Sequence, residues 1–266
     1  MTAFTKLVRS LALVVVMGCG VPVVEAFQNL FTPFGNTKIV LPRVSNNARK
    51  VENDLLSAIN EVGSRLDNSE KIQDLVQRLE QTPSIPEPAI APEVYGRWRL
   101  LYTTNTDTSS PIQRKAVDTQ KFAIYQDIVV NDDDQLQVNQ VVKFSNTAQL
   151  SVDALASTSA YPLAEFTERK STGKILGLNI LGVSVVGEEA KPDPDRPNSR
   201  IDFVFDEGNF DFGNFKIPYP VPFRLPILRD TVKGWIDITY LSDRVRIARG
   251  NKGTTFILAK EEETSD

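Results

Sequence analysis

Apolar and polar residues alternate in short runs along residues 95–260 of this chain. One run places Ile201 and Phe203 on either side of Asp202, and the runs are separated by turn residues such as 131–134 (Asn-Asp-Asp-Asp). Because successive side chains of a strand point to opposite faces, a period of two indicates strands with one buried face. Many short strands with no helical segments between them predict a mainly β protein, an antiparallel barrel or sandwich.

Two segments before these strands repeat their apolar residues at helical spacing instead. Residues 67–69 (Asp-Asn-Ser) can end one helix and cap the next. The pattern predicts a helical hairpin over 47–81, then a stiff Pro-rich linker over 82–92. The hairpin could be a lid packed on the barrel or a docking arm, and the lid is favoured because short helices need tertiary packing. The apolar positions are Val51, Leu55, Leu56, Ile59, Val62, Leu66, Ile72, Leu75, Val76 and Leu79.

A strand and a hairpin close the alternating region. Residues 234–241 read GWIDITYL, and residues 245–258 read VRIARGNKGTTFIL. The second run is interrupted at 251–253, where Asn and Gly tolerate the positive φ of a tight turn. This pattern predicts one strand followed by a β-hairpin.

These two runs, together with YGRWRLLYTT at residues 95–104, resemble the plastid lipid-associated proteins, the fibrillin family of plastids. The resemblance covers roughly residues 47–260. It implies a lipocalin-like antiparallel β-barrel over 93–260 preceded by the helical hairpin. It also implies a plastid protein that binds or organises carotenoids, prenylquinones, tocopherols or membrane lipids at plastoglobules or thylakoids. It implies no reaction and no cofactor.

The start of the first strand carries a second resemblance. Gly96-Arg97-Trp98 is similar to the Gly-x-Trp opening of lipocalins, in which the tryptophan closes one end of the barrel and a late arginine lies on its ring. Arg246 or Arg249 could take that place here. A guanidinium over an indole face contributes roughly 0.5–2 kcal/mol. The expected role of these residues is structural rather than catalytic.

Aromatic residues of the strands are candidates for a ligand pocket. An eight-stranded barrel either fills with side chains or holds one small ligand. Taken one by one, these positions are more typical of a packed core; taken together with the resemblance, they predict a pocket for an isoprenoid or acyl chain. Trp98, Leu100 and Tyr102 are expected to share one face. The candidate lining residues are Tyr102, Phe122, Tyr125, Phe144, Phe203, Phe205, Trp235 and Phe256.

Two apolar segments, 175–186 and 217–228, look less like core. The second holds four prolines, which exclude it from a central strand, so it is expected to lack a sheet partner. Such a loop either contacts lipid or covers the barrel floor. The side chains that would contact a membrane are Tyr219, Phe223, Leu225, Ile227 and Leu228.

The N-terminus carries targeting signals. Lys6 and Arg9 precede an apolar run of about 14 residues, which is too short to span a bilayer. Val24-Glu25-Ala26 then offers small residues to a signal peptidase, so residues 1–26 are predicted to be a signal peptide. Phe27 opens a basic stretch without acids, and residues 27–46 resemble the transit segment of algae with complex plastids. A plastid location follows from this reading.

Composition narrows the functions further. The chain has 30 Lys and Arg against 34 Asp and Glu; residues 1–50 hold six bases and one acid, which leaves 24 bases and 33 acids and a net charge near −9. Such acidity argues against nucleic-acid binding. The sequence has no His, and its one Cys, Cys19, lies in the predicted signal peptide, so the mature chain has no Cys- or His-based catalytic or metal site.

Three functions remain open from the sequence. The favoured one is non-catalytic binding or organisation of hydrophobic isoprenoids or lipids at a plastoglobule or thylakoid surface. The first alternative is a scaffold that holds a partner enzyme of prenylquinone synthesis. The second is an enzyme that acts on a carotenoid through carboxylates alone. Residues 261–266 are read as an acidic tail.

Overall fold

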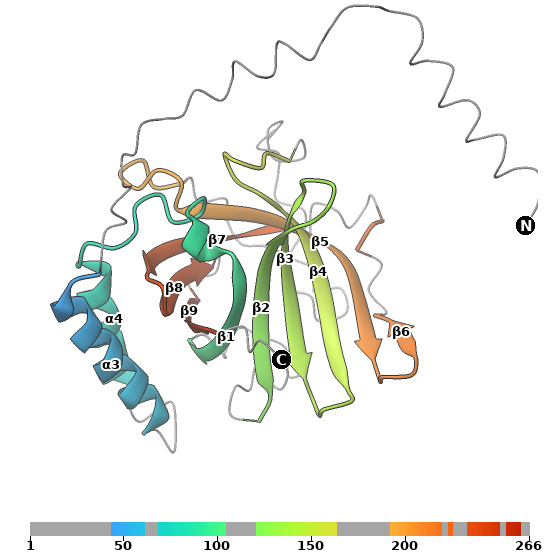
Figure 1. The fold of residues 1–266 in the computed structure, drawn as a ribbon, viewed down its shortest axis with the longest axis horizontal. Coiled ribbons are helices and arrows are strands. Elements are labelled where there is room, and N and C mark those ends of the chain that lie inside the picture. Colours follow the sequence, from blue (N-terminus) through green and yellow to red (C-terminus); the bar gives the residue numbers. More distant parts are fainter. Residues whose placement is uncertain are drawn as a thin grey trace, which may run out of the picture. The chain divides into compact units, whose positions relative to one another are not determined.

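The strands form one antiparallel sheet that curls into a ring (Figure 1). The computed structural model describes residues 44–61, 69–104, 121–163, 192–219, 223–225, 233–250 and 254–261, all within one compact unit from Pro42 to Asp266. The described strands are β1 (Gly96–Thr103), β2 (Ala123–Val130), β3 (Leu136–Lys143), β4 (Gln149–Ser157), β5 (Arg200–Asp211), β6 (Lys216–Pro218), β7 (Lys233–Leu241), β8 (Val245–Gly250) and β9 (Thr255–Lys260). Their order is β4-β3-β2-β1-β9-β8-β7-β5-β6, and pairing of β4 with β5 closes the ring. The predicted barrel is therefore confirmed.

Strand β5 makes the closure possible because it is long enough to serve three neighbours. Its first residues, 200–204, pair with β7, and residues 202–211 pair with β4. Residues 209–211 then pair with β6. The edge of β5 that β7 leaves open is thus covered by β6, and unpaired strand edges are otherwise prone to association.

Inward-facing apolar residues of these strands form the barrel core, as period-two patterning requires. Residues 85–94, which include the short 3₁₀ helix η1 (Pro92–Val94), pack against one end of this core. The buried strand residues of the barrel core are Trp98, Leu100, Ile124, Ile128, Leu136, Val138, Val142, Ala156, Ile201, Ile236, Ile238, Leu241, Ala248 and Leu258.

An irregularity in β1 moves Tyr102 out of the barrel core. The pairing of β1 with β9 shifts register between Leu100 and Tyr102. Leu100 packs in the core, whereas Tyr102 packs on the other face of the sheet. A bulge adds one residue to one strand and reverses the faces of the residues beyond it. The expectation that Tyr102 faces the same way as Trp98 and Leu100 is therefore wrong.

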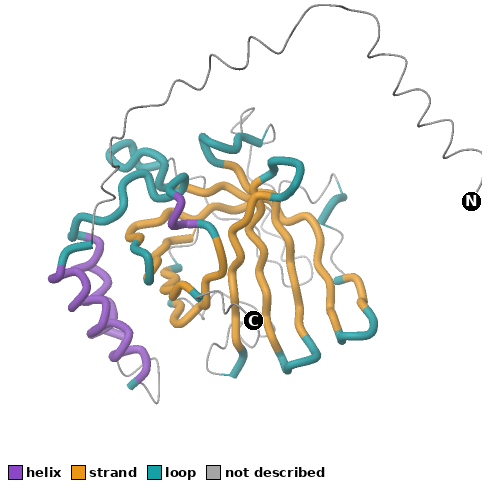
Figure 2. The backbone as a smooth tube through the Cα atoms, in the orientation of Figure 1, coloured by secondary structure: helices purple, strands orange, loops and turns teal. Residues whose placement is uncertain are grey.

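Two helices pack outside the barrel, where Figure 2 shows them in purple beside the orange strands. They are α3 (Asn46–Asn60), whose first turn is capped by the Ser45 hydroxyl accepting from the Ala48 amide, and α4 (Ser69–Glu80). Their apolar faces bury Leu55 and Leu79 against Tyr240 and other outward residues of β7–β9. The predicted helical hairpin is present, and its apolar side faces the sheet.

Several sequence expectations fall outside the described residues. These are the signal peptide, residues 27–43 of the transit segment, the apolar segment 175–186, the acidic tail beyond residue 261, and Ile227 and Leu228. No helix in the described ranges combines the length and the apolarity that crossing a membrane requires.

Candidate functional site

Trp98 lies in the barrel core near the start of β1. The indole is fully buried, and its Nε1 donates a hydrogen bond of 2.8 Å to the Val94 carbonyl oxygen. The Arg246 guanidinium carbon lies 4.9 Å from the ring centroid, and the Lys260 Nζ lies 4.7 Å from it. Of the two arginines that the sequence left open, Arg246 is the one over the ring. Arg249 points outward, where it pairs with Glu80 of α4 at 2.8 Å.

The backbone at Gly96 adopts a conformation that suits glycine and lies close to Lys260. Gly96 has a φ of +104°, a conformation that residues with a Cβ rarely adopt. A Cβ added to Gly96 would lie 3.4 Å from the Lys260 Cε and Nζ atoms, so the Lys260 side chain packs directly over this glycine. Glycine therefore lets β1 begin directly under the Lys260 side chain.

Arg246 is the most deeply buried charge of the barrel. It has no exposed surface, and burial lowers its pKa to about 9, which leaves it charged at neutral pH. Its Nη2 donates to the Gln126 Oε1, while Nε and Nη1 have no hydrogen-bond partner among the described residues. Lys260 donates to the carbonyl oxygens of Glu93 and Tyr95, and its pKa is lowered first by burial and then by Arg246. Two basic side chains, one fully buried and one half-buried, therefore lie against the Trp98 ring.

The opposite end of the barrel can be located from the strand register. Gly96 of β1 pairs with Ile128 near the end of β2, so the start of β2 lies far from Trp98. From there, Ala123 pairs with Lys143, Lys143 with Gln149, and Gln149 with Asp211. The β3–β4 and β5–β6 turns therefore lie together at this end, which is the lower end in Figure 1.

Exposed aromatic and aliphatic side chains gather on these turns. A Cβ added to Gly213 of the β5–β6 turn would lie 3.8 Å from the Thr147 carbonyl oxygen of the β3–β4 turn, so the turns are neighbours. Phe212 and Phe215 stack with centroids 5.2 Å apart, and Phe122 meets Phe144 edge-on at 5.3 Å. We call this group the aromatic rim: Phe122, which is half-buried, with Phe144, Phe212, Phe215 and Ile217, which are 40%, 41%, 58% and 46% exposed.

The sequence reading missed Phe212 and Phe215, although a signal for them exists. Phe210 and Phe212 precede Gly213-Asn214, and Phe215 and Ile217 follow it. Two short apolar alternations around a Gly-Asn pair are typical of a hairpin. Gly213 has a φ of +80°, and its amide donates to the Asp211 carboxylate at 2.8 Å. The prolines that follow this turn are typical of a loop and mask the second arm of the hairpin in the sequence pattern.

The predicted membrane loop 217–228 is only partly such a loop. Ile217 and Pro218 pair with β5, so the expectation that the segment lacks a sheet partner is wrong at its start. Proline is tolerated there because β6 is an edge strand. Phe223 is buried and stacks on Tyr219, with centroids 5.9 Å apart. Leu225 is 48% exposed.

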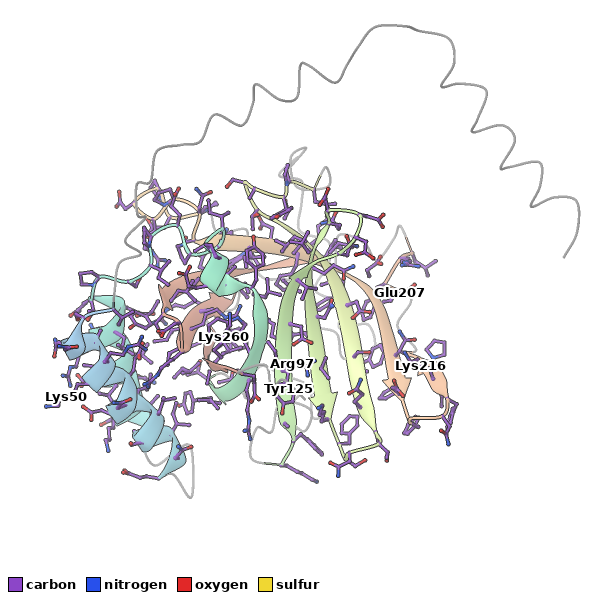
Figure 3. The ribbon with its side chains drawn as sticks, in the orientation of Figure 1. Lys50, Arg97, Tyr125, Glu207, Lys216 and Lys260 are labelled. Carbon is purple, nitrogen blue, oxygen red and sulfur yellow. The ribbon has the colours of Figure 1, made fainter. Side chains whose placement is uncertain are left out.

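The predicted pocket residues divide among several places. Phe122, Phe203 and Phe256 pack against the barrel core, and Phe205 packs in a separate cluster with Val204 and Phe223. Tyr102 lies under the helices, and Phe144 belongs to the aromatic rim. Tyr125 lies beside Arg97 (Figure 3), and the charged groups of Arg97 and Lys143 are each 5.3 Å from its ring centroid. The Arg200 guanidinium carbon lies 4.0 Å from the centroid of the Trp235 ring.

A groove of about 460 Å³ runs beside the contact between α4 and the sheet. Ile72 and Val76 of α4 form one wall, and Tyr102 and Ile257 form the other. The Arg249–Glu80 ion pair also borders it. The described residues contain no group of three His, Cys, Asp or Glu side chains able to hold a metal ion.

Three carboxylates lie together on the barrel wall, at the bulge in β5. Asp153 pairs across the strands with Glu207, and its pKa is raised first by burial and then by Glu207 and Asp206. Arg224 binds both neighbours: it lies 2.7 Å from Asp206 and also contacts Glu207. This cluster is largely engaged in ion pairs.

Sequence comparison identifies a protein family and several relatives of this chain. The PAP_fibrillin family model matches residues 49–259. The protein described as "Probable plastid-lipid-associated protein 12, chloroplastic" of Arabidopsis thaliana is 36% identical over 195 residues, covering 71% of this chain and 38% of that protein. The "Chromoplast-specific carotenoid-associated protein, chromoplastic" of Cucumis sativus is 27% identical, with 73% and 61% covered. The chain thus spans less than two thirds of the length of these relatives.

Proposed function

The chain belongs to the PAP_fibrillin family, and from this premise we propose that it is a non-catalytic plastid protein that binds or organises hydrophobic isoprenoids or lipids. The aromatic rim carries the proposal. Its side chains are exposed to water at the end of the barrel away from Trp98. Transfer of such apolar surface from water to an apolar environment is favourable, so an exposed cluster of this kind indicates a contact surface. A lipid surface, such as a plastoglobule or a thylakoid, would cover it.

The energetics of this contact favour insertion of the rim. Full burial of one large apolar side chain contributes roughly 1.5–3 kcal/mol. Phe212, Phe215 and Ile217 are each about half exposed. Burying all three in lipid should therefore contribute about as much free energy as the full burial of one or two large apolar side chains. On uncharged lipid this attraction is insensitive to salt, since no charge pair is screened.

Flotation with neutral galactolipid liposomes tests the proposal. The double variant Phe212→Ser, Phe215→Ser is expected to lose most of the flotation that the parent protein shows. Val129→Ser is the matched control, because Val129 is an exposed apolar residue near the far end of β2 and should leave flotation unchanged. Equal flotation of parent and double variant would overturn the assignment of the rim.

The ligand is addressed by a second measurement. The names of the relatives refer to plastid lipid and to carotenoid, and the proposal extends these classes to the barrel of this chain. Protein purified from its plastid is expected to carry co-extracted carotenoids, prenylquinones or lipids that mass spectrometry identifies. Recovery of the protein with no such molecule would restrict its role to the lipid surface.

The two alternatives find less support. A scaffold would be favoured by an apolar helical face left bare, but Leu55 of α3 and Leu79 of α4 are fully buried against the sheet. A carboxylate-based enzyme acting on a carotenoid would be favoured by a carboxylate pair available in the barrel mouth. The Asp206 and Glu207 carboxylates are instead held by Arg224.

A further inference from the structure

Basic side chains accompany the aromatic rim in sequence and in space. Lys121 and Lys143 directly precede Phe122 and Phe144. The Lys121 Nζ lies 5.3 Å from the centroid of the Phe122 ring. Three of the rim aromatics, counting Phe215 with Lys216, are therefore flanked by a lysine.

The strand register extends this basic group over the outer face of β1–β3. Arg99 of β1 pairs with Tyr125 of β2, and Lys143 of β3 lies over the Tyr125 ring. Figure 3 shows Tyr125 and Arg97 together on β1 and β2 and labels Lys216 at the β5–β6 hairpin. We call Arg99, Lys121 and Lys143 the basic strip; all three are exposed.

The local charge of this face differs from that of the whole chain. Arg97 is matched by Asp127, to which it donates two hydrogen bonds of 2.8 and 2.7 Å, and Lys216 lies 3.8 Å from Asp211. The basic strip places three further exposed basic side chains on this face of a protein that carries 24 bases and 33 acids beyond residue 50. A concentration of positive charge beside exposed aromatics, in an acidic protein, points to a partner that is both apolar and anionic.

We propose that the basic strip binds the anionic headgroups of a lipid surface while the aromatic rim enters its apolar layer. This inference rests on the proposed lipid contact and adds the headgroup class. Lysine suits this position because its long apolar stem can lie along the boundary while its ammonium group stays among the headgroups. An acidic protein would match the charge but would not require the exposed Phe144, Phe212 and Phe215 beside it.

Vesicle partitioning separates the two contributions. Wild type is expected to partition more strongly onto galactolipid vesicles that contain phosphatidylglycerol than onto purely neutral ones. Lys121→Gln, Lys143→Gln should lower partitioning onto the anionic vesicles roughly 10- to 30-fold at low salt, as expected for two basic residues near a charged surface. Binding to neutral vesicles should be unchanged. Raised salt should remove the difference between the two vesicle types.

The control is Lys50→Gln, Lys71→Gln, which makes the same change in net charge on the exposed sides of α3 and α4. It should partition like wild type on both vesicles. Equal binding of wild type to neutral and anionic vesicles, or equal loss in both double variants, would overturn the basic strip. Neither result would affect the flotation test of the aromatic rim on neutral liposomes. The two proposals can therefore be contradicted independently of each other.

Discussion

The Tyr240 hydroxyl on β7 donates a hydrogen bond of 2.9 Å to the Glu52 Oε1 on α3. Both side chains are fully buried, and 188 residues separate them along the chain. Arg49 lies 3.1 Å and Arg244 3.7 Å from the other carboxylate oxygen. This bond therefore connects α3 to the barrel through the buried Glu52 carboxylate, whose charge is partly compensated by Arg49 and Arg244.

Removal of the Tyr240 hydroxyl should weaken the protein. Tyr240→Phe leaves a Glu52 oxygen buried with one hydrogen bond fewer, which costs about 1–3 kcal/mol. Chemical denaturation measures the change in the free energy of unfolding. Tyr125→Phe is the control, because the Tyr125 ring lies on the outer face of the sheet; its effect should stay within about 0.5 kcal/mol. Equal effects of the two variants would contradict a specific role for the Glu52 bond.

The hydrogen bond between Tyr240 and Glu52 should also make the stability of the protein depend on pH in the alkaline range. Burial, followed by the charge of Glu52, raises the pKa of Tyr240 well above its ordinary value of 10.0. The folded protein therefore keeps this proton where the unfolded chain loses it. The resulting stabilisation is complete below pH 10 and is lost as the pH rises above it. Thermal unfolding should show a smaller loss of stability between pH 9 and pH 11 in Tyr240→Phe than in wild type; parallel curves would contradict this.

A buried ion pair joins β5 to β7. Arg200 donates to both Asp237 oxygens, at 2.7 and 2.8 Å, and the two residues are register partners. Asp237→Ala leaves a buried guanidinium without its carboxylate and should cost about 3–5 kcal/mol. The double variant Arg200→Met, Asp237→Ala should recover part of that loss. A double variant that is less stable than the single one would show that Arg200 stabilises the fold by itself.

The sequence predicts the barrel well because strand patterning depends on local alternation, but it predicts individual side-chain directions less well. Arg246 and Val245 point to opposite faces as the alternation indicates. Tyr102 does not follow Leu100, because a bulge arises from pairing with β9 and leaves no trace in β1 itself. Phe223 is buried where Gly208 of β5 leaves room for Tyr219 and Phe223, a packing that the sequence pattern of 217–228 does not indicate. The Tyr102 case depends on a strand about 155 residues away, whereas the Phe223 case depends on packing within one hairpin and the loop after it.

The targeting signals can be tested without the structure. Residues 1–26 are predicted to be removed, and Phe27 is predicted to direct passage into the plastid, because a cleavage site is followed by a basic stretch without acids. A fusion of residues 1–50 to a fluorescent protein should reach the plastid, as seen by microscopy. Phe27→Ala should leave the fusion at the outer membranes. Unchanged import of this variant would show that Phe27 does not direct passage into the plastid.

Trp98 should be the most sensitive single position of the closed end. Its indole fills the floor of the barrel core, donates to Val94 and carries two cations, Arg246 and Lys260, on its ring. Trp98→Ala should lower the free energy of unfolding by about 3–5 kcal/mol. Trp98→Phe keeps most of the packed volume and an aromatic face but loses the Nε1 donor, so a smaller loss is expected. A melting curve for Trp98→Ala that superimposes on the wild-type curve would mean that the indole does not close the barrel, and the similarity to lipocalins would then be misplaced.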